Sequence, residues 1–242
     1  MIGALFGVGA AVLIGFSDLF GRQVTNRSSA ITSASSMQAF GAISVLLSLI
    51  FWPGVVNGQG LALGALSGAG FALGLCCYYL GLTRASSAIV APLAAVLATL
   101  VPFGWAVVRN VEISALSLGS VAIALCGLVA VTGGRRPTGS TKTGIKFGLL
   151  SGLGYGIGQA VLLDVASTSG PIAIAGQRVV AFALMLPLAI LTKNRTIAPR
   201  GCKAVGVAAG VCAGGASVAF FQGLRFDPLA TVIGISLFPV FT

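Results

Sequence analysis

Side chains that could carry covalent chemistry are scarce in this chain. Its 242 residues include no histidine, five cysteines and four acidic residues, which are Asp18, Glu112, Asp164 and Asp227. No acid–base pair stands at helical spacing inside an apolar segment, and the cysteines show neither CxxC spacing nor a histidine to complete a metal site. Because the chain has no histidine, a Ser/His/Asp arrangement is excluded. The sequence predicts no enzyme, no catalytic residue, no metal site and no cofactor.

Polar side chains inside long apolar segments are the better candidates for function. Arg178 lies in the run AIAGQRVVAFALML. Polar groups are costly in lipid and usually face the interior of a helix bundle. Arg178 either extends its guanidinium to one interface or lies in a cavity, where it would attract an anionic group of a solute. Gln38 and Gln159 either join helices by hydrogen bonds or line such a cavity. We take all three as candidate solute-binding residues.

Aromatic residues and prolines extend this candidate set. Tyr79 and Trp105 would form cavity walls, although aromatic residues near the ends of spans are also typical of the membrane interface. Pro92, Pro102 and Pro239 lie in apolar segments, where a proline removes a backbone hydrogen bond and bends a helix. Helix breaks at the depth of a cavity are typical of transport sites.

Two acidic residues have both a structural and a functional interpretation. Asp18 precedes Arg22 by one helical turn, a spacing that favours an ion pair on a helix surface. Glu112 follows Arg109 in a short polar turn, where it would pair with that arginine and cap the next helix. In the functional alternative, either acid would couple transport to protons.

The composition indicates a membrane protein. Hydrophobic residues make up 57% of the chain and charged residues 7%, against about 25% charged residues in soluble domains. The apolar segments approach the roughly 20 residues that a helix needs to cross a bilayer, and none alternates as a barrel strand would. We expect an all-α, polytopic helical bundle. Nine spans are predicted, at about 2–21, 31–52, 60–82, 86–108, 114–132, 145–165, 171–191, 203–223 and 228–242.

The net charge of +10 reflects membrane topology rather than nucleic-acid binding. Basic residues are concentrated in alternate loops on one side of the expected bundle, whereas the other side holds Arg109 and Arg225. By the positive-inside rule, the basic side is cytoplasmic and Met1 lies outside. We expect a multi-pass protein of the cell (inner) membrane.

The second half of the chain repeats features of the first half in the same order. Tyr78-Tyr79 recurs as Phe220-Phe221, and Gly81-Leu82 recurs at the same offset as Gly223-Leu224. The polar, basic stretch 133–144 separates a first repeat of five spans (1–132) from a second repeat (145–242). Because five is an odd number, the second copy would insert upside down, as in inverted-repeat transporters.

Three stretches resemble the EamA branch of the drug/metabolite transporter superfamily. They are Gly81-Leu82 with the small-residue helix after it, Val111-Glu112-Ile113-Ser114 before SLGSVAIALCGLVAVTG, and the ending Phe238-Pro239-Val240-Phe241-Thr242. The resemblance covers almost the whole chain and implies ten spans in two inverted five-helix repeats. Arg178 matches the arginine of the family's seventh span, whereas Gln38 stands where the second span typically has arginine.

The resemblance implies a secondary carrier that exports or exchanges small metabolites, such as amino acids, by alternating access around a central cavity. The expected partners are a small-molecule solute and the lipid bilayer, with a homodimer left open. The alternatives are a structural or other non-transport membrane protein and, third, a membrane-embedded enzyme. Because Thr242 falls inside the ninth apolar run, we also expect the second repeat to be truncated, with its last helix missing.

Overall fold

The computed structural model describes residues 2–110, 119, 122, 126 and 140–241, and in these parts the chain is helical without a strand. Six helical segments are long and apolar enough to cross a membrane. Five of them are α1 (Ile2–Arg27), α2 (Ala30–Ser48), α3 (Gly58–Arg84), α4 (Ser87–Val108) and α7 (Gly170–Leu191). The sixth is α8 (Lys203–Phe226), which follows a short 3-10 turn at Arg200–Cys202.

Three further helices complete the described bundle. They are α6 (Thr141–Leu162), α9 (Pro228–Ile235) and α10 (Phe238–Phe241). α6 is as long as α4, but its glycines and lysines keep it outside the six apolar segments. α6 begins at Thr141, a few residues before the span predicted at 145–165. The span expected at 114–132 lies almost entirely outside the described residues.

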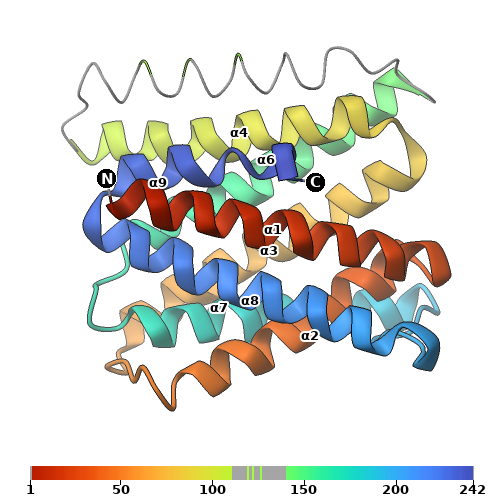
Figure 1. Ribbon diagram of the computed structural model, residues 1–242, viewed down its shortest axis with the longest axis horizontal. Helices are drawn as coiled ribbons and strands as arrows, with labels where there is room; N and C mark the ends of the chain where they lie inside the picture. The colour runs from red at the N-terminus through yellow and green to blue at the C-terminus, as the bar shows by residue number, and fades with distance from the viewer. Residues whose placement is uncertain (1, 111–118, 120–121, 123–125, 127–139, 242) are drawn as a thin grey trace.

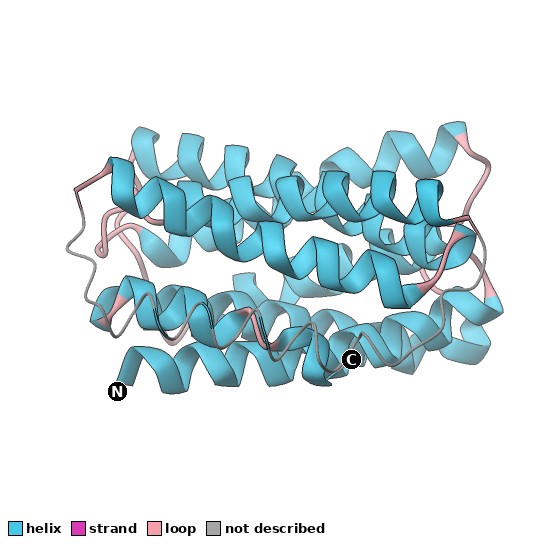
Figure 2. Ribbon diagram, turned by 90° about the horizontal axis from the view of Figure 1, so that it is seen from above, coloured by secondary structure: helices cyan, strands magenta, loops and turns pink. Residues whose placement is uncertain are grey.

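Polar side chains at the helix starts fix where several helices begin. Ser29, Asn57, Ser86, Ser140 and Asp227 each accept a hydrogen bond from a backbone N–H in the first turn of the following helix. A side chain at this position satisfies one of the N–H groups that the helix leaves without a partner. Short loops of this kind place consecutive helices antiparallel, along the long axis of the molecule (Figures 1 and 2).

Close helix crossings divide the bundle into two groups. We call α3, α4, α6 and α7 the α3 bundle, and α1, α2, α8 and α9 the α8 bundle. In the α3 bundle, a Cβ atom on Gly70 would lie 2.7 Å from the carbonyl oxygen of Gly154, and one on Gly148 would lie 2.8 Å from Leu93 Cβ. In the α8 bundle, a Cβ atom on Gly210 would lie 2.8 Å from the backbone nitrogen of Gly41. Glycine therefore lets these backbones meet at distances that a side chain would prevent.

Each group contains helices from both sides of the 133–144 stretch. In the α3 bundle, α3 packs on α6 and α7, and α4 packs on α6. In the α8 bundle, α8 packs on α1 and α2, and α9 packs on α1. The two groups meet mainly where α2 crosses α7, with smaller contacts of α2 on α3, α8 on α7 and α9 on α4. In Figure 1, α1 and α6 run in opposite directions, and so do α3 and α8.

The two ends of the bundle differ in charge. One end, on the right in Figure 1, holds the last turns of α1 and α3 and the first turns of α6 and α8. We call it the basic end. Its described basic residues are Arg22, Arg27, Arg84, Lys142, Lys146, Lys193, Arg195, Arg200 and Lys203. Arg109 and Arg225 lie at the opposite end, after α4 and in the last turn of α8.

The prolines do not all interrupt their helices. α4 continues from Ser87 to Val108 with both Pro92 and Pro102 inside it. The chain is interrupted between α9 and α10, after Ile235, and Pro239 lies in α10 just beyond that point. The helix breaks expected in α4 are therefore not observed.

Candidate functional site

A cavity of about 60 Å³ lies between the α3 bundle and the α8 bundle. A buried water needs roughly 10–15 Å³ of such space, so the cavity has room for several water molecules or a small polar group. Its polar lining comes from both bundles, and aliphatic and aromatic side chains complete it. The lining residues are Ile14, Ser17, Asp18, Met37, Gln38, Phe71, Leu75, Tyr155, Gln159, Leu162, Arg178, Ala213, Ala216, Ser217, Phe220, Ile235 and Phe238.

Arg178 is the central cation of this cavity. It is 5% exposed and belongs to α7, close to the middle of that helix. Its Nε donates to Ser217 Oγ at 3.1 Å, and its Nη1 donates to Gln38 Oε1 at 3.0 Å. Nη2 donates to the Ala213 carbonyl and to Ser217 Oγ. The acceptors of these bonds are uncharged, and all of them belong to the α8 bundle. Arg178 does not reach an interface, so the snorkelling alternative is wrong.

The guanidinium also faces an aromatic ring from its own bundle. Arg178 Cζ lies 5.8 Å from the centroid of the Phe71 ring, within the range of a cation–π contact. Phe71 in turn packs edge to face on Tyr155, with centroids 5.6 Å apart. The cation is therefore held by polar groups on one side and aromatic surface on the other.

Asp18 and Gln159 bring further polar groups to the cavity. Asp18 is 4% exposed and Gln159 is 5% exposed. Asp18 is thus buried and does not lie on the helix surface as expected, whereas Arg22 is exposed. The amide oxygen of Gln159 has no hydrogen-bond partner among the described residues. A buried acceptor without a partner is costly unless a ligand or water donates to it.

Other residues predicted for the site lie elsewhere. Tyr79 is 1% exposed and lies outside the cavity lining, although its hydroxyl donates to Met37 Sδ at 3.7 Å and Met37 is part of that lining. Trp105 is 38% exposed near the end of α4 and does not line the cavity. Glu112 lies outside the described residues.

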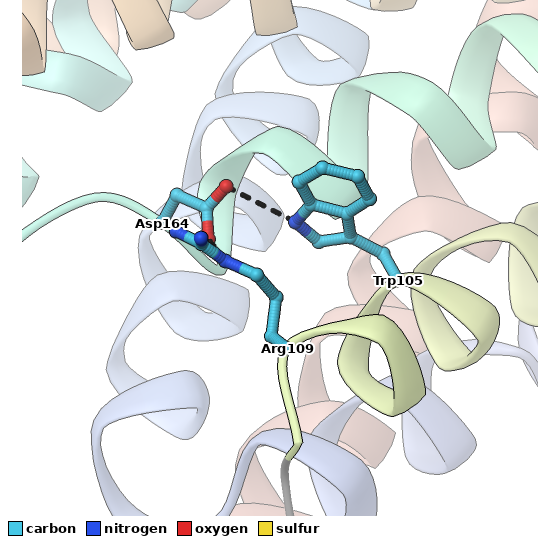
Figure 3. Close-up of polar contacts among 3 residues, drawn as sticks. All are labelled: Trp105, Arg109 and Asp164. Carbon is cyan, nitrogen blue, oxygen red and sulfur yellow. Dashed lines mark hydrogen bonds and ion pairs between the residues drawn. The ribbon is translucent and has the colours of Figure 1, made fainter.

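Trp105 belongs to a polar cluster at the end opposite the basic end (Figure 3). Arg109 Nε is 2.8 Å from Asp164 Oδ1, and Trp105 Nε1 donates to Asp164 Oδ2 at 3.0 Å. Arg109 Cζ lies 5.7 Å from the centroid of the Trp105 ring. Among the described residues, Arg109 pairs with Asp164; Glu112, the partner predicted from the sequence, lies outside them. The cluster ties the end of α4 to the end of α6, within the α3 bundle.

Sequence reasoning missed several lining residues, among them Ser17, Tyr155 and Ser217. Ser17 Oγ donates to the Ala209 carbonyl at 2.7 Å, and Ser217 is the main acceptor for Arg178. Single hydroxyls in apolar runs give little signal. The internal repeat gives one such signal. Tyr155 and Ser217 correspond to Ile14 and Leu75 in the first repeat, and all four residues line the cavity.

The described residues contain no group of three or more histidine, cysteine, aspartate or glutamate side chains that could hold a metal ion. What the cavity offers chemically is a cation, an acid, two amides and hydroxyls in one partly open space. Such a set binds and orients a polar solute by charge and hydrogen bonding.

No family model matches the chain, and no curated protein matches it. By contrast, 18 chains of known structure match its fold. One of these, "Crystal structure of protein", superposes with a TM-score of 0.81 at 15% identity, covering 99% of this chain and 86% of the other. At that identity the likeness concerns the fold alone. The six long apolar helices among the described residues indicate a helical, multi-pass integral membrane protein.

Proposed function

We propose that this protein is a secondary transporter of small organic solutes that carry an anionic or zwitterionic group. The observation that carries the proposal is the buried Arg178, which lines a partly open cavity between two helix groups. Ionisable groups at this depth are expensive and typically mark a transport pathway. In a purely structural membrane protein, apolar side chains would fill this space at lower cost.

The arrangement of small residues supports an inverted duplication. Gly3, Gly7 and Gly15 of α1 recur at a constant offset as Gly144, Gly148 and Gly156 of α6. The first set faces Asp227, Thr231 and Phe241, and the second set faces Ile89, Leu93 and Val101. Thus α1 meets α9 and α10 through the same positions by which α6 meets α4. The opposite directions of α1 and α6 are those expected of inverted repeats (Figure 1).

The cavity lies where these repeats would be related to each other. Gln38 on α2 and Arg178 on α7 stand at nearly corresponding positions and hydrogen-bond directly. Asp18 on α1 and Gln159 on α6 correspond at the offset of the α1 and α6 glycines, and both line the cavity. A central site at the interface of two repeats is typical of alternating-access carriers. We infer on this basis that the protein is a carrier of the EamA type, with its basic end in the cytoplasm of a cell whose inner membrane it spans.

The chemistry of the lining favours a carrier over an enzyme. No histidine is present in the sequence, and the described acids are separated by the bundle, with Asp18 in the cavity and Asp164 at one end. The lining instead provides groups that hold a solute without transforming it. Arg178 offers charge, and the unpaired Gln159 oxygen accepts a hydrogen bond.

Reconstituted protein provides the test. Proteoliposomes would be assayed for uptake of radiolabelled amino acids and small carboxylates, with and without a pH gradient. Arg178→Gln keeps a hydrogen-bonding side chain but removes the charge. Because a hydrogen bond to a charged group contributes about 1.5–3 kcal/mol, we expect uptake to fall roughly 10- to 100-fold.

Arg225→Gln is the matched control. It removes the same charge from an exposed arginine in the last turn of α8 and should leave uptake unchanged. Undiminished uptake by Arg178→Gln at equal membrane abundance would exclude Arg178 from solute binding. Uptake by the unmodified protein no faster than leakage into empty liposomes, across the whole panel, would refute the transport proposal.

A further inference from the structure

Among the described residues, polar contacts across the boundary between the α3 bundle and the α8 bundle identify side chains that join the two groups. Within the bundles, hydrogen bonds reinforce the glycine crossings, as from Ser67 to the Gly158 carbonyl and from Thr231 to the Gly3 carbonyl. Across the boundary, hydrogen bonds between helices come from Arg178 in the central cavity and from Tyr79 nearer the basic end. Groups joined in this way are suited to move as units.

Tyr79 separates two spaces. On one side, its hydroxyl contacts Met37 Sδ, and Met37 lines the central cavity. On the other side, Tyr79 lines a polar vestibule of about 220 Å³ at the basic end. The vestibule is formed by Arg22, Thr25, Asn26, Tyr79, Leu82, Thr83, Ala85, Ser86 and Ser87. The Tyr79–Met37 contact is thus part of the partition between the cavity and the vestibule.

Gly21 makes room for the Tyr79 hydroxyl. A Cβ atom on Gly21 would overlap Tyr79 Oη, so even alanine at this position would displace the ring from its seat. Ser33 Oγ donates to the Gly21 carbonyl at 2.6 Å and holds the seat in place between α1 and α2. The side chain comes from the α3 bundle and the seat from the α8 bundle.

Phe221 occupies a matching position toward the opposite end. It is the counterpart of Tyr79 in the second repeat, is 1% exposed, and extends from α8 to the start of α7. A Cβ atom on Gly170 would overlap the Phe221 ring, and Trp52 packs on that ring with centroids 6.4 Å apart. Its neighbour Phe220 lines the central cavity. Here the side chain comes from the α8 bundle and the glycine from the α3 bundle.

We propose that Tyr79 and Phe221 are the two barriers of this carrier, each closing one end of the central cavity by seating against a glycine of the other bundle. Movement of the two bundles about the α2–α7 crossing withdraws one ring from its glycine while the other stays seated. The inference rests on the proposed transport function, because the two barriers are assigned to a carrier. The position of each barrier is testable without measuring transport.

The test uses a cysteine inside the cavity as a reporter of access. Ala216→Cys changes a buried lining residue only slightly, in a background where the five native cysteines are replaced by alanine. A small, charged, membrane-impermeant thiol reagent is added to either side of sealed vesicles. Lys142→Cys and Arg225→Cys, in separate samples, identify the basic end and the opposite end.

Gly21→Ala should expose the reporter to the basic-end side, and Gly170→Ala should expose it to the opposite side. In each case we expect the labelling rate from that side to rise about tenfold or more, with little change from the other side. Gly9→Ala is the control, because a Cβ atom at Gly9 meets no atom within 4 Å. It should leave both labelling rates unchanged.

Tyr79→Ala and Phe221→Ala test the same barriers by removing the rings instead of displacing them. They should reproduce the effects of Gly21→Ala and Gly170→Ala, respectively. Equal changes from both sides, or labelling at the unmodified rate in Tyr79→Ala, would overturn the proposal. A side-specific result in a protein that transports none of the tested solutes would support the barriers while refuting the transport proposal.

Discussion

The two repeats resemble each other at the helix crossings and differ from each other in the central cavity. At several crossings, related positions hold the same residue type, as Gly64 and Gly68 on α3 correspond to Gly206 and Gly210 on α8. In the cavity, related positions differ in chemistry, as Asp18 corresponds to Gln159, Gln38 to Arg178, and Leu75 to Ser217. The crossings require the same close backbone approach in both repeats. A cavity that binds an asymmetric solute requires different groups on its two sides.

The largest loss of stability is expected where backbones touch. Gly68→Ala and Gly210→Ala each place a Cβ atom against the facing helix, near the Gln177 carbonyl and the Gly41 nitrogen, respectively. Backbone atoms cannot rotate away as the end of a side chain can, so we expect each variant to lose about 1–3 kcal/mol. Unfolding in detergent by heat or by increasing SDS measures the loss.

Gly176→Ala is the control for both variants, because its Cβ atom would meet only Leu61, at 3.9 Å. It should unfold as the unmodified protein does. If only one of the two crossing variants were destabilised, the crossings would not be equivalent.

A smaller and more specific effect is expected from exchanging Gln38 and Arg178. In the double variant Gln38→Arg/Arg178→Gln, the charge remains but its surroundings change. Leu75 corresponds to Ser217 and Ala213 corresponds to Phe71, so the moved guanidinium loses its hydroxyl acceptor and its aromatic ring. We expect uptake to stay roughly 10-fold or more below the unmodified rate, as lost charged hydrogen bonds would cause.

Adding Leu75→Ser to the exchanged protein tests this reason. The new hydroxyl should recover part of the lost uptake, because it restores an acceptor in the related position. Full activity of the exchanged protein without Leu75→Ser would show that the two sides of the cavity are interchangeable.

The smallest effect is expected from the acid outside the cavity. Asp164→Asn removes an ion pair in which the Arg109 side chain is 55% exposed, and exposed pairs typically contribute no more than about 1 kcal/mol. Stability should change by less than that, and uptake should be unaffected. The matched change in the cavity, Asp18→Asn, should reduce uptake and leave the Arg109–Asp164 ion pair at the bundle end in place. Equal uptake by the two variants would remove Asp18 from the proposed site.

The sequence was most informative where a physical requirement repeats along the chain. The lengths of the apolar segments predict most of the described helices to within a few residues. Arg178, Gln38 and Gln159 were recognised because polar groups are rare in apolar segments. All three line the cavity.

What could not be predicted depends on three-dimensional proximity. Asp18 has Arg22 at helical spacing, but the side chain of Asp18 faces the cavity while Arg22 is exposed. Trp105 was assigned to the site by its residue type, whereas its indole N–H is used by Asp164, which is distant in the sequence. Pro92 and Pro102 predict helix breaks locally, but α4 remains one helix in its packed setting.

The composition of the two bundles has a consequence for how the protein is made. α1 emerges from the ribosome before α8 and α9, yet these helices complete its glycine face, and the bond from Thr231 to the Gly3 carbonyl joins residues that are 228 positions apart. During synthesis, α1 and α2 are therefore in the bilayer before α8 and α9 are made, with Asp18 and Gln38 exposed to lipid or to an insertion chaperone. Contacts of such long range form late and leave an intermediate open to misassembly. Proteolytic quality control should accordingly act most strongly on chains whose α8 or α9 is altered, even when the cavity residues are intact.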